Sequence, residues 1–482
     1  MVALNRLIAH RSSSPLLRAA TLYSLPFLPR FFCQQSNSEI YGNSSNEGGN
    51  SSSTARPVIS IDRSGLYNPP VHEHKAREES PMARHIRSLI KFRGGPITVA
   101  EYMSEVLTNP NAGFYMNRDV FGSGGDFVTS PEVSQMFGEL VGAWSVCLWQ
   151  QMGEPKQVNL VELGPGRGTL MADLLRGTAK FKEFSEALSV RLVECSPALR
   201  KLQHSVLQCT EVEAQKDDRK VGDAFSTFSG VPVSWHVDLE QVPKGVPTII
   251  IAHEFYDALP IHQFQKTPRG WTEKLIDIAE DSDGFRFVLS PEPTAATKLY
   301  LAKRIKRLSL DEISKLEHVE VCPQAIELTK NIGKRVELDG GGALIIDYGQ
   351  NGVISDSLQA IRNHKFVHVL DDPGTADLSD YVDFAYVRHV VEEMTGEVAA
   401  LGPISQSRFL GALGINFRLE ALLQNATDEQ AEALQVGYWK LVGDGPAPFW
   451  EGEDELTPIG MGSRYLALAI VNKKIGAPAC FE

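Results

Sequence analysis

The sequence predicts an α/β fold built on a doubly wound, mostly parallel sheet, and three observations lead to this prediction. From about residue 156 onward, short apolar runs alternate with stretches of helical character. The runs are almost continuously apolar, as expected of strands buried on both faces. A glycine-rich turn at 164–168 joins the first run to an amphipathic helical stretch. Strands that alternate with helices indicate a parallel sheet covered by helices on both sides.

The N-terminal segment differs in composition from the rest of the chain. Residues 1–38 contain four arginines and six serines but no acidic residue, and arginines and prolines interrupt the apolar runs. This composition is typical of a mitochondrial transit peptide and not of a secretory signal, although a disordered basic tail would share it. Of residues 36–53, 14 of 18 are Ser, Asn or Gly, which leaves too little apolar surface for folding. We expect a transit peptide at 1–38 and a disordered linker at 39–80.

Composition also limits the class of partner. The chain has 482 residues, with 47 Lys plus Arg against 60 Asp plus Glu, and this acidic balance argues against a nucleic-acid partner. No apolar run approaches the ~20 residues of a membrane-spanning helix, so no membrane span is expected. The six cysteines show no Cys-x-x-Cys spacing, so we expect neither a disulfide framework nor a metal site.

The folded part is expected to begin with a helical region at 81–155. Helices are predicted at 82–92 and 98–107, before a glycine-dense loop. A third helix is predicted from Ser130 to about Met152, with Ser130 as its N-cap and Pro131 in its first turn. Thr129, Ser130 and Asp126 are expected either to close over a ligand or to cap this helix.

A Rossmann-like domain is predicted at 156–482. Apolar runs predict six of its strands, at 158–163, 190–193, 231–237, 248–252, 343–347 and 463–471. Two insertions interrupt the alternation, at about 261–330 and 375–455. The first contains alternating stretches that predict antiparallel hairpins, and the second is predicted to be mainly helical from 386 to 443.

The glycine turn is compatible with few ligands. A phosphate-binding P-loop needs a lysine after its last glycine, but Thr169 follows Gly168. A dinucleotide site needs G-x-G-x-x-G, whereas Gly164, Gly166 and Gly168 are spaced as G-x-G-x-G after Glu162. This form is common in class I S-adenosylmethionine (SAM) methyltransferases, and an acid before the turn suits the ammonium and sulfonium of SAM. A tight turn without a ligand remains the alternative.

Two more acids follow predicted strands and strengthen the cofactor interpretation. Glu194 ends the second strand, 26 residues after Gly168, where an acid can accept from ribose hydroxyls. Asp238 follows the third strand, where it can accept from an adenine amino group. Alternatively, Glu194 is an acid at a helix N-terminus and Asp238 is a turn residue. In a parallel sheet all these acids would meet at the carboxyl edge of neighbouring strands.

The candidate chemical residues follow the fourth strand, in the stretch AHEFYDALP at 252–260. Glu254 and Asp257 flank two aromatic residues there. Paired carboxylates can hold a guanidinium, localise its charge and accept its proton, while aromatic walls exclude water. The alternative is a strand end whose carboxylates have only local partners. His253 is either a base or a core histidine.

The chain contains several longer motifs, in the order EYM, GFYMNRDVFGSGGDFVTSPEVSQMFGELVGAW, VELGPGRGTLMADLLR, HEFYDALP, IIDYG, PGTADLSDYVDF and GPISQSRFLGALGI. In these motifs and their order the chain resembles the MidA family. The resemblance covers about residues 81–471.

The resemblance implies an activity and a location. Eukaryotic members of the family are SAM-dependent protein-arginine methyltransferases of the mitochondrial matrix that dimethylate an arginine symmetrically on a complex I core subunit and serve as complex I assembly factors. By position, Gly164, Gly166 and Gly168 fall in the SAM loop of the family and Glu194 at its ribose acid. Glu254 and Asp257 fall in its acidic-aromatic loop. His253 and Tyr256 depart from the Asn and Phe common in bacterial members, which leaves the role of residue 253 open.

Two other functions remain compatible with the sequence. One is a SAM-dependent methyltransferase of a small molecule, against which the large helical region at 386–443 weighs weakly. The other is a non-catalytic assembly chaperone that keeps a methyltransferase fold, against which the intact glycine turn and Glu194 speak. The oligomeric state and the target arginine do not follow from the sequence.

Overall fold

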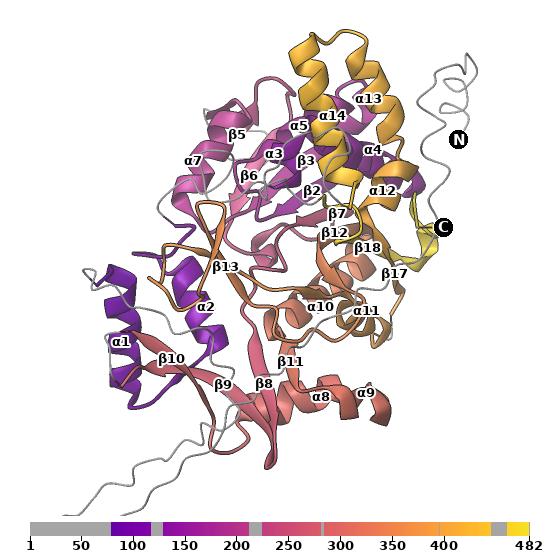
Figure 1. Cartoon of the computed structure of the whole chain (residues 1–482). Coiled ribbons are helices and arrows are strands. Elements are labelled where there is room, and N and C mark those ends of the chain that lie inside the picture. Colours follow the sequence, from indigo (N-terminus) through magenta and orange to yellow (C-terminus); the bar gives the residue numbers. More distant parts are fainter. Residues whose placement is uncertain are drawn as a thin grey trace, which may run out of the picture. The chain divides into compact units, whose positions relative to one another are not determined.

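The computed structural model describes residues 79–116, 129–211, 224–280, 284–394, 396–444 and 460–481 (Figure 1). The predicted transit peptide, nearly all of the predicted linker and Asp126 lie outside these residues. Within the described ranges, no helix combines the length and the apolar character required to cross a lipid bilayer. In the same ranges, no cluster of three or more His, Cys, Asp or Glu side chains is arranged to hold a metal ion.

The centre of the fold is a mixed sheet whose inner strands run parallel. In spatial order its main strands are β17 (Val398–Ser405), β18 (Tyr465–Asn472), β12 (Gly341–Gln350), β7 (Thr248–His253), β2 (Val158–Leu163), β3 (Leu188–Val193), β6 (Pro232–His236), β5 (Ala224–Ser226) and β4 (Cys209–Glu211). The strands from β12 to β6 pair in parallel, and β18 and β17 run antiparallel at one side. From β2 the chain continues to β3 and β6 on one side, whereas β7 and β12 lie on the other. The point where the order reverses is therefore between β2 and β7, the place where open α/β sheets bind ligands.

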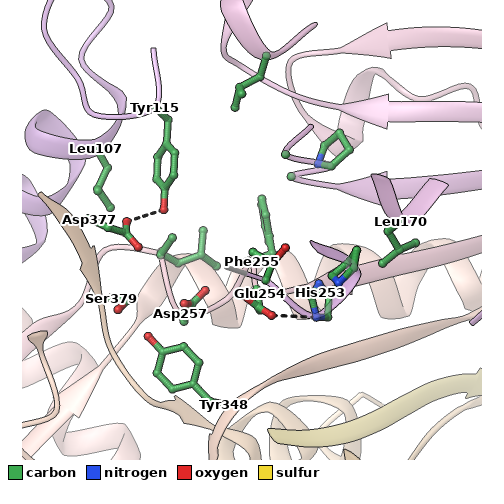
Figure 2. Close-up of a pocket in the computed structure, with 18 of the residues that line it drawn as sticks. Leu107, Tyr115, Leu170, His253, Glu254, Phe255, Asp257, Tyr348, Asp377 and Ser379 are labelled. Atoms are coloured by element: carbon green, nitrogen blue, oxygen red, sulfur yellow. Dashed lines mark hydrogen bonds and ion pairs between the residues drawn. The ribbon is translucent and has the colours of Figure 1, made fainter. Parts of the chain in front are cut away.

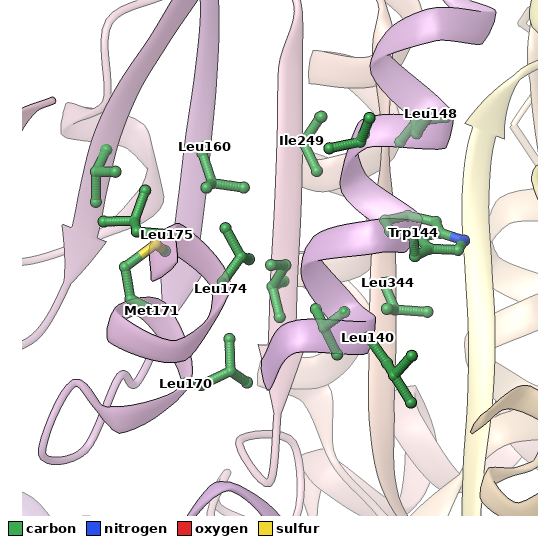
Figure 3. Packing of buried hydrophobic residues seen from close by; sticks show 14 of the residues in the cluster. Leu140, Trp144, Leu148, Leu160, Leu170, Met171, Leu174, Leu175, Ile249 and Leu344 are labelled. Atoms are coloured by element: carbon green, nitrogen blue, oxygen red, sulfur yellow. The ribbon is translucent and has the colours of Figure 1, made fainter. Parts of the chain in front are cut away.

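Helices cover both faces of this sheet because successive strand residues point to opposite sides. On β7, Ile249 and Ile251 join one core cluster, whereas Ile250 and Ala252 join the other. The first cluster is shown in Figure 3 and contains residues from α4 (Gln135–Gln151), α5 (Thr169–Thr178), α12 (Gln406–Ala412), α13 (Ile415–Leu423) and α14 (Asp428–Val442). The second contains residues from α10 (Pro323–Asp339) and α11 (Phe384–Glu392).

A second, antiparallel sheet is built mainly from the first predicted insertion, with one short strand, β1 (Ile97–Thr98), from the N-terminal helical region. Its strands are β1, β9 (Gly270–Ile278), β8 (His262–Thr267), β11 (His318–Val321) and β10 (Phe285–Leu289), so the predicted hairpins are confirmed. The helices α1 (Pro81–Arg93) and α2 (Val99–Thr108) pack on this sheet through a third core cluster. The short elements η3 (Thr297–Leu301), α8 (Ala302–Ile305) and α9 (Leu310–Lys315) lie between β10 and β11 in the chain.

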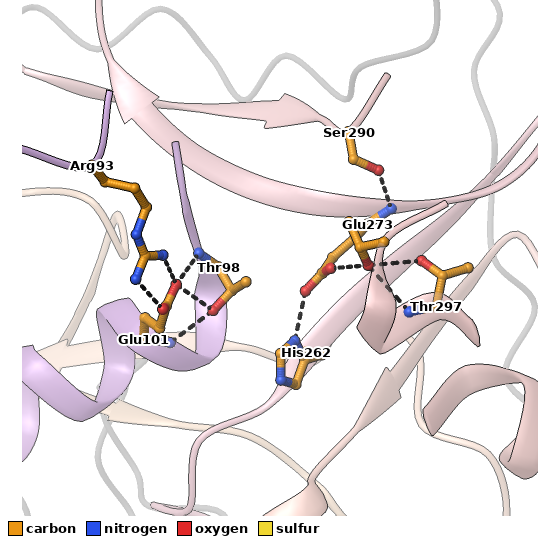
Figure 4. A network of polar contacts seen from close by, with 8 residues as sticks. Arg93, Thr98, Glu101, His262, Glu273, Ser290 and Thr297 are labelled. Atoms are coloured by element: carbon orange, nitrogen blue, oxygen red, sulfur yellow. Dashed lines mark hydrogen bonds and ion pairs between the residues drawn. The ribbon is translucent and has the colours of Figure 1, made fainter. Parts of the chain in front are cut away.

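Polar contacts form at the start of α2 and within this second sheet, as Figure 4 shows. Thr98 and Glu101 form a capping box at the start of α2, and Arg93 donates to the same glutamate at 2.7 Å. In the sheet, buried Glu273 interacts with the His262 ring at 2.6 Å. The capping box supplies acceptors for amide groups that the first turn of a helix otherwise leaves unsatisfied.

In the sequence, a small third sheet lies between strands β12 and β17 of the main sheet. It consists of β14 (Lys365–Val367), β13 (Gln359–Arg362) and β15 (Asp377–Ser379), all antiparallel. It is followed by β16 (Val382–Asp383), which pairs in parallel with the end of β12. The remaining short elements are α3 (Ser130–Val133), α6 (Lys182–Ala187), α7 (Pro197–Val206), η2 (Leu239–Gln241) and η4 (Lys473–Ile475).

Four local predictions need correction or qualification. The single helix expected from Ser130 is wrong, because Ser134 adopts an extended conformation and separates α3 from α4. Ser130 is not the N-cap, which is Thr129. The region at 386–443 is mainly helical but also contains β17, an edge strand of the main sheet. The boundary expected at 155/156 runs between α4 and β2, two elements that share one core.

Candidate functional site

A cavity of about 590 Å³ opens at the carboxyl ends of the parallel strands. It lies at the point where the strand order reverses, so four strand ends contribute to it. Further lining residues come from α2 and from the β13–β15 sheet, which are far away in sequence. Six acids line it, against two arginines, Arg167 and Arg464. The acids are Glu132, Glu162, Glu194, Glu254, Asp257 and Asp377.

The glycine turn forms one end of the cavity. Gly164, Gly166 and Gly168 all have positive φ values, of 62°, 53° and 87°, which side chains disfavour. A Cβ on Gly164 would also lie 2.5 Å from Cδ2 of Phe255. The backbone of the turn can therefore line the cavity only because these positions carry no side chain. Gly164 and Gly166 line it, whereas Gly168 is the N-cap of α5 beside Gln203.

Two buried carboxylates face the same end. Glu162 lies on β2, and among the described residues no group donates a hydrogen bond to its Oε2. Burial, and then the charge of Glu194, raise the pKa of Glu162 to about 8. Glu194 follows β3 and accepts from the Ser196 amide at 2.7 Å and from Nε2 of Gln203 at 3.1 Å. Burial is also the main reason why the pKa of Glu194 is raised.

These residues fit the cofactor that the sequence predicts. A buried acceptor without a donor is costly, so Glu162 is suited to a cationic or hydrogen-bonding ligand. Glu194 lies at the end of the neighbouring parallel strand, as the sequence predicts for an acid that accepts from ribose hydroxyls. Asp238 does not line the cavity. It is exposed and accepts from the Gln241 amide at 3.0 Å, which caps η2, although its neighbour Val237 does line the cavity. A contact of Asp238 with the cofactor thus stays a prediction.

Glu254 follows β7 in a left-handed backbone conformation, with φ = 47°. Its Oε1 accepts hydrogen bonds from the amide and hydroxyl of Ser130, at 3.0 and 3.2 Å. The same oxygen lies 3.1 Å from Nε2 of His253, although the geometry is not that of a hydrogen bond (Figure 2). His253 is itself buried, with its ring 4.6 Å from the ring of Phe137. Ser130 thus orients the candidate catalytic glutamate, a contact that sequence reasoning did not foresee.

Asp257 lies deeper in the same loop. It is buried, and its Oδ1 has no hydrogen-bond partner among the described residues. Burial raises the pKa of Asp257 well above its usual range, and the negative charges of Asp347, Asp377 and Glu254 raise it further. A hydrogen bond with Tyr348 opposes this effect. Such a carboxyl group would bind a cation strongly, since the cation would relieve the repulsion among the acids.

Asp347 fixes the loop that carries both candidate catalytic acids. It is fully buried on β12, and its Oδ2 accepts from the amides of Phe255, Tyr256 and Asp257, at 3.1, 2.9 and 3.4 Å. Its pKa is raised to about 8, by burial and then by Glu254, against the effect of these amides. Asp347 was not predicted as a site residue, although it lies in IIDYG, one of the motifs that carry the family resemblance. An acid at the end of a predicted parallel strand was the signal that could have identified Asp347.

Asp377 lines the cavity and is another acid that sequence reasoning missed. It lies on β15, is buried, and accepts a hydrogen bond of 2.6 Å from the Tyr115 hydroxyl (Figure 2). The carbonyl of Tyr115 accepts from the Ser196 hydroxyl at 2.7 Å. The stretch around Asp377 is rich in turn residues and has no hydrophobic period. Nothing local therefore indicated that this segment folds back on the cavity.

Comparison with known proteins gives a consistent result. A protein-family model described as "Putative S-adenosyl-L-methionine-dependent methyltransferase" matches residues 140–404, more than half of the chain. Two relatives carry the name "Protein arginine methyltransferase NDUFAF7, mitochondrial". The mouse relative is 41% identical over 415 residues, which cover 85% of this chain and 89% of the relative. The human relative is 43% identical over 392 residues, which cover 80% and 85%.

Structural comparison supports the fold. The crystal structure of a Burkholderia thailandensis protein bound to S-adenosyl-homocysteine matches 83% of this chain and 93% of that protein. The TM-score is 0.64 at 24% sequence identity. The predicted fold class, a Rossmann-like methyltransferase fold with insertions, is thereby confirmed.

Proposed function

Because this chain belongs to the MidA family of SAM-dependent methyltransferases, we propose that it is a mitochondrial protein-arginine methyltransferase. The names of the mouse and human relatives support both the arginine substrate and the mitochondrial location. The composition of residues 1–38 agrees with import into this organelle. The predicted cofactor, SAM, is that of the family.

We further propose symmetric dimethylation of an arginine on a complex I core subunit in the matrix, in support of complex I assembly. This part rests on the family resemblance. The chain contributes a cavity that suits such a substrate, because the arginine side chain can be buried there while the rest of the protein substrate stays outside.

The observation that carries the arginine substrate is the group of acids in the cavity beyond the glycine turn. Glu254, Asp257 and Asp377 line the cavity, and the pKa of Asp257 is raised first by burial and then by the charges of Asp347, Asp377 and Glu254. A guanidinium is a permanent cation with five donors, so it can neutralise several carboxylates at once. Arginine is also a poor nucleophile because its nitrogens share their electrons across the group. Carboxylates that localise its charge compensate for this.

The residues of the chain then have distinct tasks. Glu162, Gly164, Gly166 and Glu194 would hold SAM, which supplies an activated methyl group when bound. Gly168 and Asp238 are proposed to assist at its edges. Glu254 is the proposed catalytic residue that orients the guanidinium and accepts a proton at its carboxylate, because Ser130 fixes its position. Asp257 is proposed to hold the same guanidinium through its unpartnered oxygen. Phe255, Tyr348 and Tyr465 line the cavity and exclude water.

Mass spectrometry of complex I core subunits from cells that lack this protein tests the proposal. We expect one arginine to lose its two symmetric methyl groups, and re-expression of the wild type to restore them. Unchanged arginine methylation on all core subunits would contradict the proposed substrate.

Titration of SAM into the purified full chain addresses the alternatives. Saturable heat is expected for a methyltransferase, whereas no binding would favour a non-catalytic chaperone. With labelled SAM and a mitochondrial extract, label in protein supports the proposal. Label confined to small molecules would favour a small-molecule methyltransferase.

A further inference from the structure

Asp377 lines the same cavity as Glu254 and Asp257 but comes from a different segment, strand β15, and the proposed function gives it no separate role. Figure 2 shows it near one end of the drawn site, joined to Tyr115, with Asp257 between it and Glu254 in this view. We infer that Asp377 is a substrate-binding residue, an inference that rests on the proposed function. It contacts the guanidinium together with Asp257, and Tyr115 positions it.

The first support is the way in which Asp377 is held. It is buried, with an exposed fraction of 6%, and still lines the cavity. Its Oδ1 accepts from the Tyr115 hydroxyl at 2.6 Å, the length of a charge-assisted O–H···O⁻ bond. Burial and the charge of Asp377 raise the pKa of Tyr115 well above its usual value, so the phenol keeps its proton and donates. The carboxylate is therefore fixed in orientation at the cavity wall, as a substrate-binding group requires.

The second support is electrostatic. Asp257 is surrounded by Asp347 from β12, Asp377 from β15, Glu254 from its own loop and the hydroxyl of Tyr348. Of these carboxylates, Asp347 is occupied by three backbone amides, whereas Asp377 and Glu254 line the cavity. A cation that enters between Asp257 and Asp377 would neutralise the repulsion between them.

The third support concerns the shape of the cation. Asp257 and Asp377 come from separate segments that line the cavity, the loop after β7 and strand β15. A guanidinium carries donors on three nitrogens around a flat group, so it can donate to carboxylates on different sides at once. An ammonium is a compact point charge with three donors on one nitrogen. Several acids that different segments bring to one cavity thus favour arginine over lysine as the methyl acceptor.

Tyr115 also connects Asp377 with the cofactor end. Its carbonyl accepts from the Ser196 hydroxyl at 2.7 Å, and the Ser196 amide donates to Glu194 at 2.7 Å. Tyr115 follows α2, which packs on the second sheet, whereas Ser196 follows β3 of the main sheet. The substrate-binding acid therefore takes its position from a residue anchored beside the cofactor acid.

Kinetics of Asp377→Asn in the full chain, with SAM and an arginine-containing substrate peptide, test the inference. We expect the KM for the peptide to rise by about 10- to 100-fold, the range for losing a hydrogen bond to a charged group. The affinity for SAM should stay within about 2-fold, because Asp377 lies away from the glycine turn.

A pH profile separates direct binding from a structural effect. Removing the charge of Asp377 removes one cause of the raised pKa of Asp257. The acid limb of kcat/KM should therefore move to lower pH in Asp377→Asn, whereas a loss of structure alone would leave its position unchanged. Asp356→Asn, an exposed acid paired with Lys274 outside the cavity, is the matched control and should show neither change.

Tyr115→Phe gives a second test if Asp377→Asn folds poorly. This variant keeps the ring and the backbone contact with Ser196 but loses the hydroxyl that holds Asp377. We expect a smaller rise in KM, of about 3- to 10-fold, and little change in kcat. If the wild type is active but both variants keep the wild-type KM and an unshifted acid limb of kcat/KM, the role of Asp377 is contradicted, whereas the proposed function is not. A wild type that methylates no arginine would contradict the proposed function as well.

Discussion

The two ends of the cavity are built in different ways. At the cofactor end, the defining feature is space, since Gly164, Gly166 and Gly168 adopt positive φ values and leave room for a ligand against bare backbone. At the proposed substrate end the defining feature is a group of carboxylates, since burial and then the charges of neighbouring acids raise the pKa values of Asp257 and Asp347. Added bulk should therefore damage the first end most, and removal of charge the second.

The largest effect is expected from bulk at the cofactor end. Gly166 has φ = 53° and lines the cavity, so Gly166→Val would both strain the turn and fill ligand space. We expect no measurable binding of SAM by calorimetry. Gly352→Val is the control, because a Cβ there meets no atom within 4 Å. Wild-type affinity in Gly166→Val would refute the assignment of this end to the cofactor.

Removal of charge at the substrate end should give the next largest effect. Glu254→Gln keeps the size of the side chain and an oxygen that can accept from Ser130. Turnover should fall by about 100-fold or more, because a neutral amide neither localises the guanidinium charge nor takes a proton. Binding of SAM should be nearly unchanged. Glu420→Gln on the exposed side of α13 serves as control. Full activity of Glu254→Gln would exclude Glu254 from the chemistry.

A smaller effect on turnover is expected from Asp347, whose carboxylate holds the backbone amides of the loop that carries Glu254 and Asp257. In Asp347→Asn, one of the two acceptor oxygens becomes an NH2 group, which faces backbone N–H donors on either side. We expect kcat to fall by about 10-fold as the loop of Glu254 and Asp257 shifts, with a smaller change in the KM for the peptide.

A matched variant separates this positioning role from a general loss of stability. Glu320 is likewise a buried carboxylate that accepts from successive backbone amides, those of Ser357 and Leu358, but it does not line the large cavity. Glu320→Gln should lower the melting temperature in the same way and leave kcat unchanged. If both variants lose kcat to the same degree, Asp347 has no special role in positioning.

The smallest effect concerns stability and pH at the cofactor end. The pKa of Glu162 is about 8 in the folded protein, against about 4.3 in the unfolded chain. Between these values the folded state holds a proton that the unfolded state has lost, so the free energy of unfolding falls as pH rises. Relative to Glu162→Gln, the wild type should lose up to about 1.4 kcal/mol per pH unit between pH 5 and 8.

Urea unfolding of both proteins without SAM measures this difference. Addition of SAM should reduce it, because a bound ammonium would favour the charged form of Glu162. Parallel pH dependence of the two proteins would mean that Glu162 is not held protonated in the folded protein.

The two ends of the cavity also differ in how much of each could be predicted from the sequence. The strand at 158–163 and its glycine turn were predictable, because a local apolar run and adjacent glycines determine them. Glu194, Glu254 and Asp257 were predictable as residues at strand ends. Asp377 was not, since its place in the cavity depends on a turn-rich segment that returns from the β13–β15 sheet.

Local signals also misled at particular positions. Strand β17 was missed because Gly402 and Pro403 interrupt its pattern in the manner of a turn, where the structure has a β-bulge between Leu401 and Ile404. The start of the third helix was misplaced because Ser130 has the features of an N-cap, yet its amide and hydroxyl bind Glu254. In both cases a contact made across the fold outweighed the preference of the local sequence.

The ring of Phe255 occupies the space that a Cβ on Gly164 would need. Because Phe255 lies directly between Glu254 and Asp257 in the chain, any substitution that enlarges residue 164 must be matched by a smaller residue 255. That exchange would release the loop that presents both acids. On the proposed function, residues 164 and 255 thus couple the binding site of the methyl donor to that of the methyl acceptor. A change of residue 164 therefore requires a compensating change of residue 255.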